Sequence, residues 1–136
     1  GGHLEAQSWI EELGLQEHVL TPGFIDDRDL PVLLKLCHCF IFPSTHEGFG
    51  LPVLEAMACG APVISSNTSS IAEVVNFEPA FFDPFDEDSI AAKITEVLEN
   101  PTLRATLAEH GPNSDFTELA KTVEKGAGIE MRAKKK

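Results

Sequence analysis

The chain has 136 residues, of which 43% are hydrophobic and 24% are charged, and its formal net charge at pH 7 is −12. This length fits one domain of ordinary size, and the apolar content is too high for a natively disordered chain. No uninterrupted apolar run approaches the roughly 20 residues that cross a bilayer, and no signal-peptide pattern is present. The excess of acidic side chains disfavours nucleic acid as a partner, because its phosphates would be repelled.

The three cysteines, Cys37, Cys39 and Cys59, are an odd number without dense spacing and so do not indicate a disulfide framework, which favours a reducing compartment. The run from Cys37 through His38 to Cys39 resembles a short metal-binding motif. Ligands so close in sequence do not easily converge on one ion, and no second ligand pair follows at finger-like spacing. We therefore expect no metal site, and thiols buried between a helix and a strand.

The first elements of the chain alternate helical and extended patterns. Apolar residues at helical spacing predict a helix that ends at Gly14, which suits a left-handed cap. The run 19–25 contains Pro22 and Gly23 and is predicted to be a brief strand that passes into a loop. The apolar stripe of the first helix consists of Leu4, Trp9, Ile10 and Leu13.

A second helix and a buried strand follow. Asp27 or Asp29 is expected to cap this helix at its N-terminus. The run 39–42 is apolar at every position, as expected of a strand that is covered on both faces. The apolar stripe of the second helix consists of Leu30, Leu33, Leu34 and Cys37.

The second half of the chain repeats this alternation. A helix is predicted from about Pro52, which suits a first turn, to Gly60, and strands are predicted at 62–65 and 80–82. A short helix lies near 70–75. Apolar residues at helical spacing predict three later helices. The first contains Ile90, Ile94, Val97 and Leu98 and ends at Asn100 and Pro101. The second contains Leu103 and Leu107, and the third contains Phe116, Leu119, Ala120 and Val123.

The short helix near 70–75 carries a capping signature. Ser70 and Glu73 have the S-x-x-E spacing of a capping box, which predicts a structural role for Glu73. Strands separated by helices in this order predict an α/β fold with a Rossmann-like parallel sheet and helices on both faces.

A glycine-containing loop at 47–50 carries the functional signal. Gly48 and Gly50 allow a close backbone approach, and free amides at a helix N-terminus favour an anion such as phosphate. Glu47 and Glu55 flank the same place, and carboxylates favour hydroxyl donors such as those of sugars. Together these groups suit a nucleotide sugar. A Gly-x-Gly pattern is weak by itself, however, and the residues alone leave a solvent-exposed helix face as an equal alternative.

The segment 43–67, PSTHEGFGLPVLEAMACGAPVISSN, resembles the donor-site signature of family 4 (group 1) retaining glycosyltransferases of the GT-B fold. Glu47 and Glu55 stand in the E-x7-E spacing of that family, and the similarity extends over about residues 3–110. The resemblance implies the C-terminal, donor-binding lobe of a two-lobed enzyme. The resemblance is greatest to the mannosyl- or rhamnosyltransferase branch that serves polysaccharide and glycoconjugate biosynthesis.

The resemblance also assigns roles to the loop. Glu47, the catalytic candidate, would hold the transferred hexose, together with the backbone of Gly48, Phe49 and Gly50. We expect Glu47 to position the donor and stabilise charge rather than to act as a nucleophile. Leu51 would place an amide near the phosphates.

Three further residues are implicated in binding the nucleotide. Glu55 would accept hydrogen bonds from the ribose hydroxyls, and Phe24 and Ile25 would lie near the base. His46 is immediately adjacent to Glu47 and is interpreted as a loop residue rather than a donor contact. The family needs no cofactor or bound metal in general, so the implied small-molecule partner is the donor itself, such as a GDP- or UDP-hexose.

The resemblance covers only part of such an enzyme. Residues 1–125 are expected to form the donor-binding domain, truncated at its N-terminal side, and 126–136 a basic, disordered tail. The implied protein partner is the missing acceptor-binding lobe, and the full-length enzyme is expected in the cytoplasm, with peripheral association at the membrane face. The fragment alone is expected to be inactive. The alternatives are a non-catalytic nucleotide- or sugar-binding module and an inert interaction domain.

Overall fold

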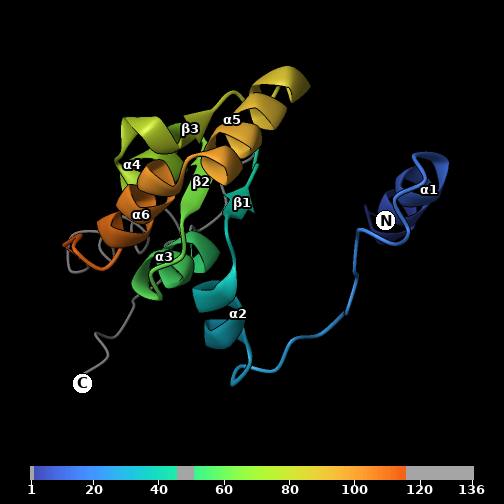
Figure 1. The fold of residues 1–136 in the computed structure, drawn as a ribbon, viewed down its shortest axis with the longest axis horizontal. Helices are drawn as coiled ribbons and strands as arrows, with labels where there is room; N and C mark the ends of the chain where they lie inside the picture. The colour runs from blue at the N-terminus through green and yellow to red at the C-terminus, as the bar shows by residue number, and fades with distance from the viewer. Residues whose placement is uncertain (1, 46–50, 116–136) are drawn as a thin grey trace.

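A computed structural model of the chain describes residues 2–45 and 51–115 (Figure 1). Its strands are β1 (Phe40–Phe42), β2 (Val63–Ser66) and β3 (Phe81–Phe82). Its helices are α1 (Gly2–Glu12), α2 (Leu30–Leu36), α3 (Leu51–Ala58), α4 (Ser69–Val75), α5 (Glu87–Glu99) and α6 (Pro101–His110), with a short 3-10 helix, η1 (Glu78–Ala80), before β3. No helix within these ranges is long and apolar enough to cross a membrane.

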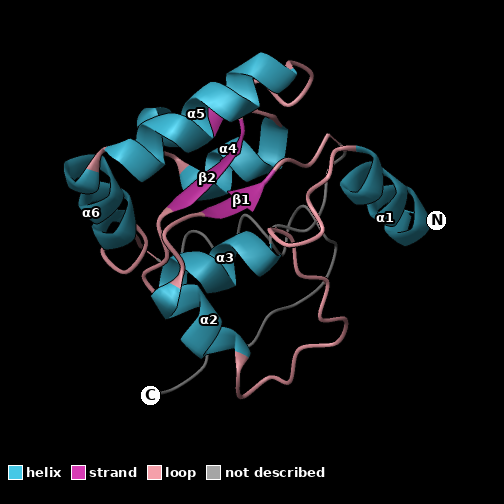
Figure 2. Cartoon of the chain, turned by 45° about the vertical axis from the view of Figure 1, so that its right-hand side comes forward, coloured by secondary structure: helices cyan, strands magenta, loops and turns pink. Residues whose placement is uncertain are grey.

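The strands form one parallel sheet in the order β1-β2-β3, with Ile41 opposite Ile64 and Ser65 opposite Phe81 (Figure 2). All four residues of β2 are buried, and successive side chains of a strand point to opposite faces, so both faces of the sheet are covered there. Helices α3 and α4 contact β2, and α5 contacts β3. This arrangement confirms the predicted Rossmann-like α/β fold.

The hydrophobic core lies between the sheet and these helices. Its centre is Ile64 of β2, and each large aliphatic side chain buried there contributes roughly 1.5–3 kcal/mol of transfer free energy. The helical part of the core consists of Leu34 from α2, Val53, Ala56 and Met57 from α3, Ile71, Val74 and Val75 from α4, Val97 from α5 and Leu107 from α6.

The predicted helix ends at Gly14 and Gly60 are confirmed. Gly14 has a φ of 67°, its N–H donates to Glu11 O, and the N–H of Leu15 donates to Ile10 O, which is a Schellman closure of α1. Gly60 has a φ of 78° and follows the end of α3. At both positions a left-handed backbone ends the helix where glycine meets no steric penalty.

The arm, residues 2–29, extends away from the body of the molecule, and α1 lies apart from the sheet in both views (Figures 1 and 2). The apolar stripe predicted for α1 does not enter the core, because Trp9 is 59% and Leu13 is 62% exposed. The helix prediction is therefore confirmed, and Trp9 and Leu13 of its apolar stripe lie outside the core.

The strand predicted at 19–25 is wrong. These residues carry no regular secondary structure, and Gly23 has a φ of 75°. A strand exists only where a neighbour supplies hydrogen bonds, Pro22 removes one donor, and no other described segment pairs with this run.

The capping box predicted at Ser70 is also wrong. The cap position of α4 is Thr68, whose side chain makes no cap hydrogen bond, and Ser70 lies inside the first turn. Glu73 is exposed on α4. The helix begins earlier because Thr68 has the extended backbone of a cap residue. The predicted helix around Phe116 to Val123, the tail 126–136 and the domain boundary at 125 lie outside the described residues.

Candidate functional site

Helix α3 presents two of the predicted site residues on its outer side. Leu51 is the first residue of the helix and Glu55 lies one turn later, so their side chains share one face. The opposite face buries Val53, Ala56 and Met57, while Leu51 and Glu55 are exposed. A ligand at the start of α3 could therefore reach the Glu55 carboxylate without disturbing the core.

The start of α3 follows the carboxyl end of β1, the edge where open parallel sheets bind their ligands. The chain leaves β1 through Pro43, Ser44 and Thr45, and then passes through 46–50 to Leu51. The remaining predicted residues of this loop, Glu47, Gly48, Phe49 and Gly50, together with His46, lie outside the described residues. Their predicted roles therefore stay predictions.

Side chains at the end of β2 and directly after it connect the carboxyl ends of the two neighbouring strands. The Ser66 hydroxyl donates to Phe42 O at 3.4 Å, and the Thr68 hydroxyl donates to Ser44 O at 3.5 Å. Ser65 is fully buried, and its hydroxyl donates to Ser66 O at 3.1 Å. These positioning residues were missed by sequence reasoning, although a polar run directly after a buried strand was a visible signal.

The other two predicted binding residues, Phe24 and Ile25, line a separate hollow at the first turn of α2. This arm pocket has a volume of about 420 Å³. Its lining comes from the arm and α2, so neither Leu51 nor Glu55 contributes to it. The lining residues are Phe24, Ile25, Asp26, Asp29, Val32 and Leu33.

Asp26 is held in place by Arg28. One carboxylate oxygen, Oδ1, accepts from the Arg28 backbone N–H at 2.9 Å, and the guanidinium nitrogens lie 3.4 Å from the carboxylate. The backbone hydrogen bond, and then the guanidinium, hold the pKa of Asp26 below its ordinary value. The carboxylate is therefore a fixed anion, although the exposed ion pair itself adds little stability.

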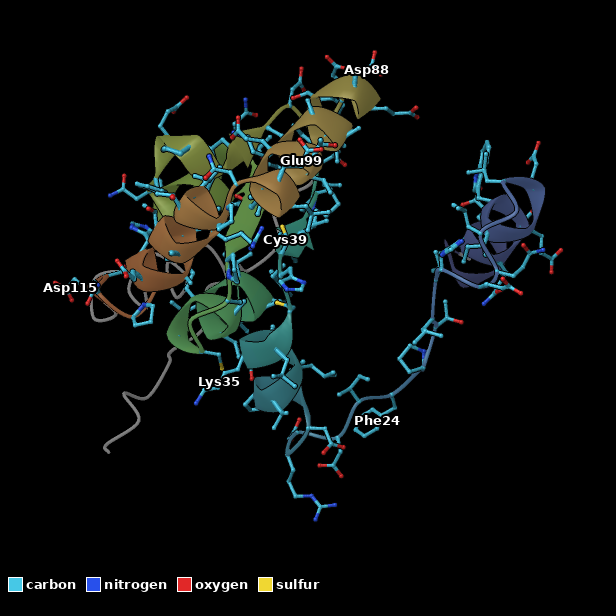
Figure 3. The ribbon with its side chains drawn as sticks, viewed as in Figure 1. Phe24, Lys35, Cys39, Asp88, Glu99 and Asp115 are labelled. Carbon is cyan, nitrogen blue, oxygen red and sulfur yellow. The ribbon has the colours of Figure 1, made fainter. Side chains whose placement is uncertain are left out.

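The cysteines lie where the sequence predicted, because Cys37 follows α2 and Cys39 directly precedes β1 (Figure 3). All three thiols, including that of Cys59, are free and partly buried. Burial raises the pKa of Cys37, and burial together with the neighbouring Cys37 raises the pKa of Cys39 to about 11. In the described part of the chain, no group of three or more His, Cys, Asp or Glu side chains is placed to hold a metal ion.

Two of the basic side chains support the fold around α5. The Lys93 ammonium donates to Pro79 O at 2.9 Å and to Glu96 at 3.0 Å. The Arg104 guanidinium donates to the carbonyls of Val97 and Leu98 at the end of α5. Within 2–45 and 51–115 the other Lys and Arg side chains are Arg28 and Lys35, at the two ends of α2.

Comparison with known proteins identifies the family. The family model described as "Glycosyl transferases group 1" matches residues 2–114. The chain belongs to this family. The expected resemblance is thereby confirmed.

Two of the similar curated proteins are mannosyltransferases of Escherichia coli. The chain is 43% identical over 101 residues to the serotype-specific mannosyltransferase WbdA of Escherichia coli, a match that covers 74% of this chain and 12% of WbdA. It is 44% identical over 89 residues to the O-antigen chain mannosyltransferase B of Escherichia coli, covering 65% of this chain and 23% of that protein. The chain thus spans a quarter or less of the length of these two relatives.

A solved structure also matches. Sucrose-phosphate synthase from Thermosynechococcus elongatus superimposes with a TM-score of 0.73 and 28% identity over 88% of this chain and 29% of that one. The parallel sheet with its helices is therefore a Rossmann-like unit of the GT-B glycosyltransferase type.

Proposed function

We propose that this chain is the nucleotide-sugar-binding part of a retaining hexosyltransferase, of the mannosyl-transferring kind, that acts in polysaccharide or glycoconjugate biosynthesis. The observation that carries the proposal is the placement of Glu55, one turn into α3, on the face that turns away from the core. This helix follows the carboxyl end of β1 and the loop that contains Glu47. Family membership and the two mannosyltransferase relatives support the reaction class.

In this proposal each group at the start of α3 meets a different part of the donor. The Glu55 carboxylate accepts hydrogen bonds from the ribose hydroxyls, and the amide of Leu51 lies near the diphosphate. The backbone of Gly48, Phe49 and Gly50 completes the contact with phosphate and hexose. A helix N-terminus carries partial positive charge, so this end of α3 favours the anionic diphosphate over a neutral group.

The chemistry demanded of these residues is charge stabilisation. As the bond between the anomeric carbon and the diphosphate oxygen breaks, negative charge grows on the departing nucleoside diphosphate. Hydrogen-bond donors that are already held in place stabilise this charge and so lower the barrier. Glu47 positions the hexose and stabilises the positive charge that develops at the anomeric carbon. The proposal includes neither a resident metal nor a cofactor, and the donor is the small molecule that the site holds.

The positions of the basic side chains limit how well the chain can bind and turn over a donor by itself. Lys93 and Arg104 donate to backbone carbonyls around α5, so they serve the fold rather than a diphosphate. We therefore propose that this chain binds donors weakly and does not turn them over without the acceptor-binding lobe and further basic side chains. That assembly would work in the cytoplasm, at the membrane face where glycoconjugates are built.

The test measures the binding of GDP, UDP and ADP, with changes in amide chemical shift and calorimetry as the two readouts. At least one nucleotide should shift the amides at the start of α3, and Glu55→Ala should weaken its binding about tenfold through lost charge-assisted hydrogen bonds. Glu99→Ala removes another exposed carboxylate, from α5, and should leave binding unchanged. Equal affinity of Glu55→Ala and the parent chain would refute the assigned role.

A second measurement separates transfer from mere binding. The complete protein that contains this sequence should transfer hexose from the nucleotide sugar to an acceptor, and Glu47→Ala should abolish the transfer. Binding without transfer by the complete protein would favour the non-catalytic nucleotide-binding module, and robust transfer by the 136-residue chain alone would contradict the proposed need for a partner lobe.

A further inference from the structure

Helix α2 carries an apolar side that the rest of the described structure leaves open. Every residue of α2 except Lys35 is apolar, as in a helix that is covered all round, yet Leu34 is its one buried residue. Val32, Leu33 and Leu36 are 54%, 48% and 73% exposed, and helical periodicity places all three opposite Leu34. We call this side the α2 stripe. Because α2 lies at the edge of the body, the α2 stripe is accessible to a further molecule (Figures 1 and 2).

The α2 stripe has opposite charges at its two ends. Asp29 occupies the N-cap position and makes no cap hydrogen bond, and Lys35 stands in the last turn. Both side chains are exposed, and neither forms an ion pair with another described residue. Six residues of helix separate the two by about 9 Å. The α2 stripe is therefore an apolar surface with an anion at one end and a cation at the other.

Such a surface is complementary to a second copy of itself. When two α2 helices pack antiparallel about a twofold axis near Val32, each Asp29 lies opposite Lys35 of the second copy, and each Leu36 lies beside the first turn of the other helix. A parallel pair would instead place Asp29 beside Asp29 and Lys35 beside Lys35, and these like charges would repel. The order of the charges therefore favours the antiparallel pair.

We propose that the α2 stripe is a self-association surface through which two copies of the chain form an antiparallel, twofold-symmetric pair. Val32 and Leu36 form its apolar centre, and two ion pairs between Asp29 and Lys35 form its rim. The inference goes beyond the proposed function, because the groups assigned to the donor lie on α3 and in the loop before it.

The size and charge of the surface set the expected strength of this association. One short helix covers far less than the roughly 800 Å² per partner of a standard interface. The net charge of −12 on each copy also opposes contact. The dissociation constant should therefore be on the order of 100 µM, which makes the pair a transient one.

Sedimentation equilibrium of the 136-residue chain measures the association, from about tenfold below to about tenfold above that concentration. The parent chain should change from monomer to dimer over this range, and dilution should shift the amides of 29–36. Leu36→Glu places a charge in the apolar centre twice, because of the symmetry, and should weaken association more than about tenfold. Leu98→Glu is the matched control, since Leu98 is 50% exposed on α5, and it should associate like the parent chain.

Exchange of the two charges tests the antiparallel geometry. Asp29→Lys and Lys35→Asp each replace two ion pairs with two like-charge contacts, and each should weaken association about tenfold. The double variant restores opposite charges across the pair at an unchanged net charge, and should recover the affinity of the parent chain to within about threefold. Glu99→Lys makes the same change of charge as Asp29→Lys at an exposed position of α5 and should not weaken association.

The outcomes separate the surface, its geometry and the proposed function. A monomer throughout the concentration range, or association that Leu36→Glu leaves intact, overturns the self-association surface. A double charge variant that stays as weak as the single ones overturns the antiparallel arrangement. Circular dichroism of each variant distinguishes lost association from lost folding. Nucleotide binding that depends on Glu55 is measured separately, and its failure would overturn the proposed function alone.

Discussion

Gly111 stands directly after α6 and packs on the backbone of Met57 in α3. Its φ of −58° is open to any residue, so it is space rather than conformation that demands glycine here. A Cβ at this position would overlap the carbonyl oxygen, Cα and carbonyl carbon of Met57, and a backbone cannot turn aside as a side chain can.

We therefore expect Gly111→Ala to lower the free energy of unfolding by about 3 kcal/mol, the upper part of the usual overpacking range. Denaturant titration followed by circular dichroism measures the change. Asn113→Ala, an exposed position nearby, serves as the control and should stay within about 0.5 kcal/mol of the parent chain. A Gly111→Ala variant as stable as the control would mean that the end of α6 can move off α3 at no cost.

The raised pKa of Cys39 makes the folded chain less stable as the pH becomes alkaline. Its pKa rises from an ordinary 9.0 to about 11 because burial disfavours the thiolate, so between these values the unfolded chain ionises this thiol and the folded chain does not. The unfolded state is then favoured, and the stability contributed below pH 9.0 is lost progressively as the pH rises towards about 11. Cys39→Ala should show a shallower loss over the same pH interval in denaturant titrations. An identical slope in both proteins would rule out the raised pKa of Cys39.

At the scale of single elements, the stability of α5 depends on its N-cap residue, Asp86. The Asp86 carboxylate accepts from the backbone N–H groups of Asp88 and Ser89, which otherwise have no intrahelical partner. Asp86→Ala should cost about 1 kcal/mol of unfolding free energy, measured by thermal and denaturant unfolding. Asp86→Asn keeps an acceptor oxygen at the same place and should retain most of that stability. Equal losses in the two variants would assign the effect to charge rather than to capping.

The elements that sequence could predict are those whose pattern depends on burial alone. β1 lies in a continuous apolar run and β2 begins with Val63 and Ile64, and buried apolar residues of this kind form strands where helices cover both faces of a sheet. The run 19–25 has a similar composition but no neighbouring strand, and a sequence pattern does not reveal whether a neighbour is present. The cap of α4 was misplaced for a related reason, because Thr68 and Ser70 are both suitable cap residues and backbone geometry chose between them.

The residues of the candidate site also differ in whether their placement could be predicted from the sequence. The outward placement of Leu51 and Glu55 on α3 could be predicted, because helical periodicity alone separates them from the buried Val53 and Met57. The pocket contribution of Asp26 could not be predicted, because it depends on the course of the arm relative to α2. Asp27 or Asp29 was predicted to cap α2, and Asp29 occupies the cap position, but its side chain makes no cap hydrogen bond.

At the scale of the whole molecule, the buried apolar side chains lie in the body, and the arm carries large exposed ones. The largest fully buried apolar side chains come from the sheet and from α3, α4 and α5, whereas Trp9, Leu20 and Phe24 of the arm are 59%, 86% and 90% exposed. The Gln7 side chain of α1 donates a hydrogen bond to the Thr21 hydroxyl at 2.9 Å, and this contact stays within the arm. Hydrophobic burial therefore stabilises the body, and the arm gains little of it.

This division predicts a gradient of amide hydrogen exchange along the chain. The amides of β2 should exchange only through global unfolding, because the strand is central, fully buried and paired on both sides. The amides of 19–25 should exchange orders of magnitude faster, since local opening there breaks few contacts. The amides of α5, which packs on β3 and α6, serve as an internal reference and should resemble β2 rather than the arm. Protection of 19–25 equal to that of β2, measured by nuclear magnetic resonance, would mean that the arm packs against a surface in solution, and its loss on dilution would identify that surface as a second copy of the chain.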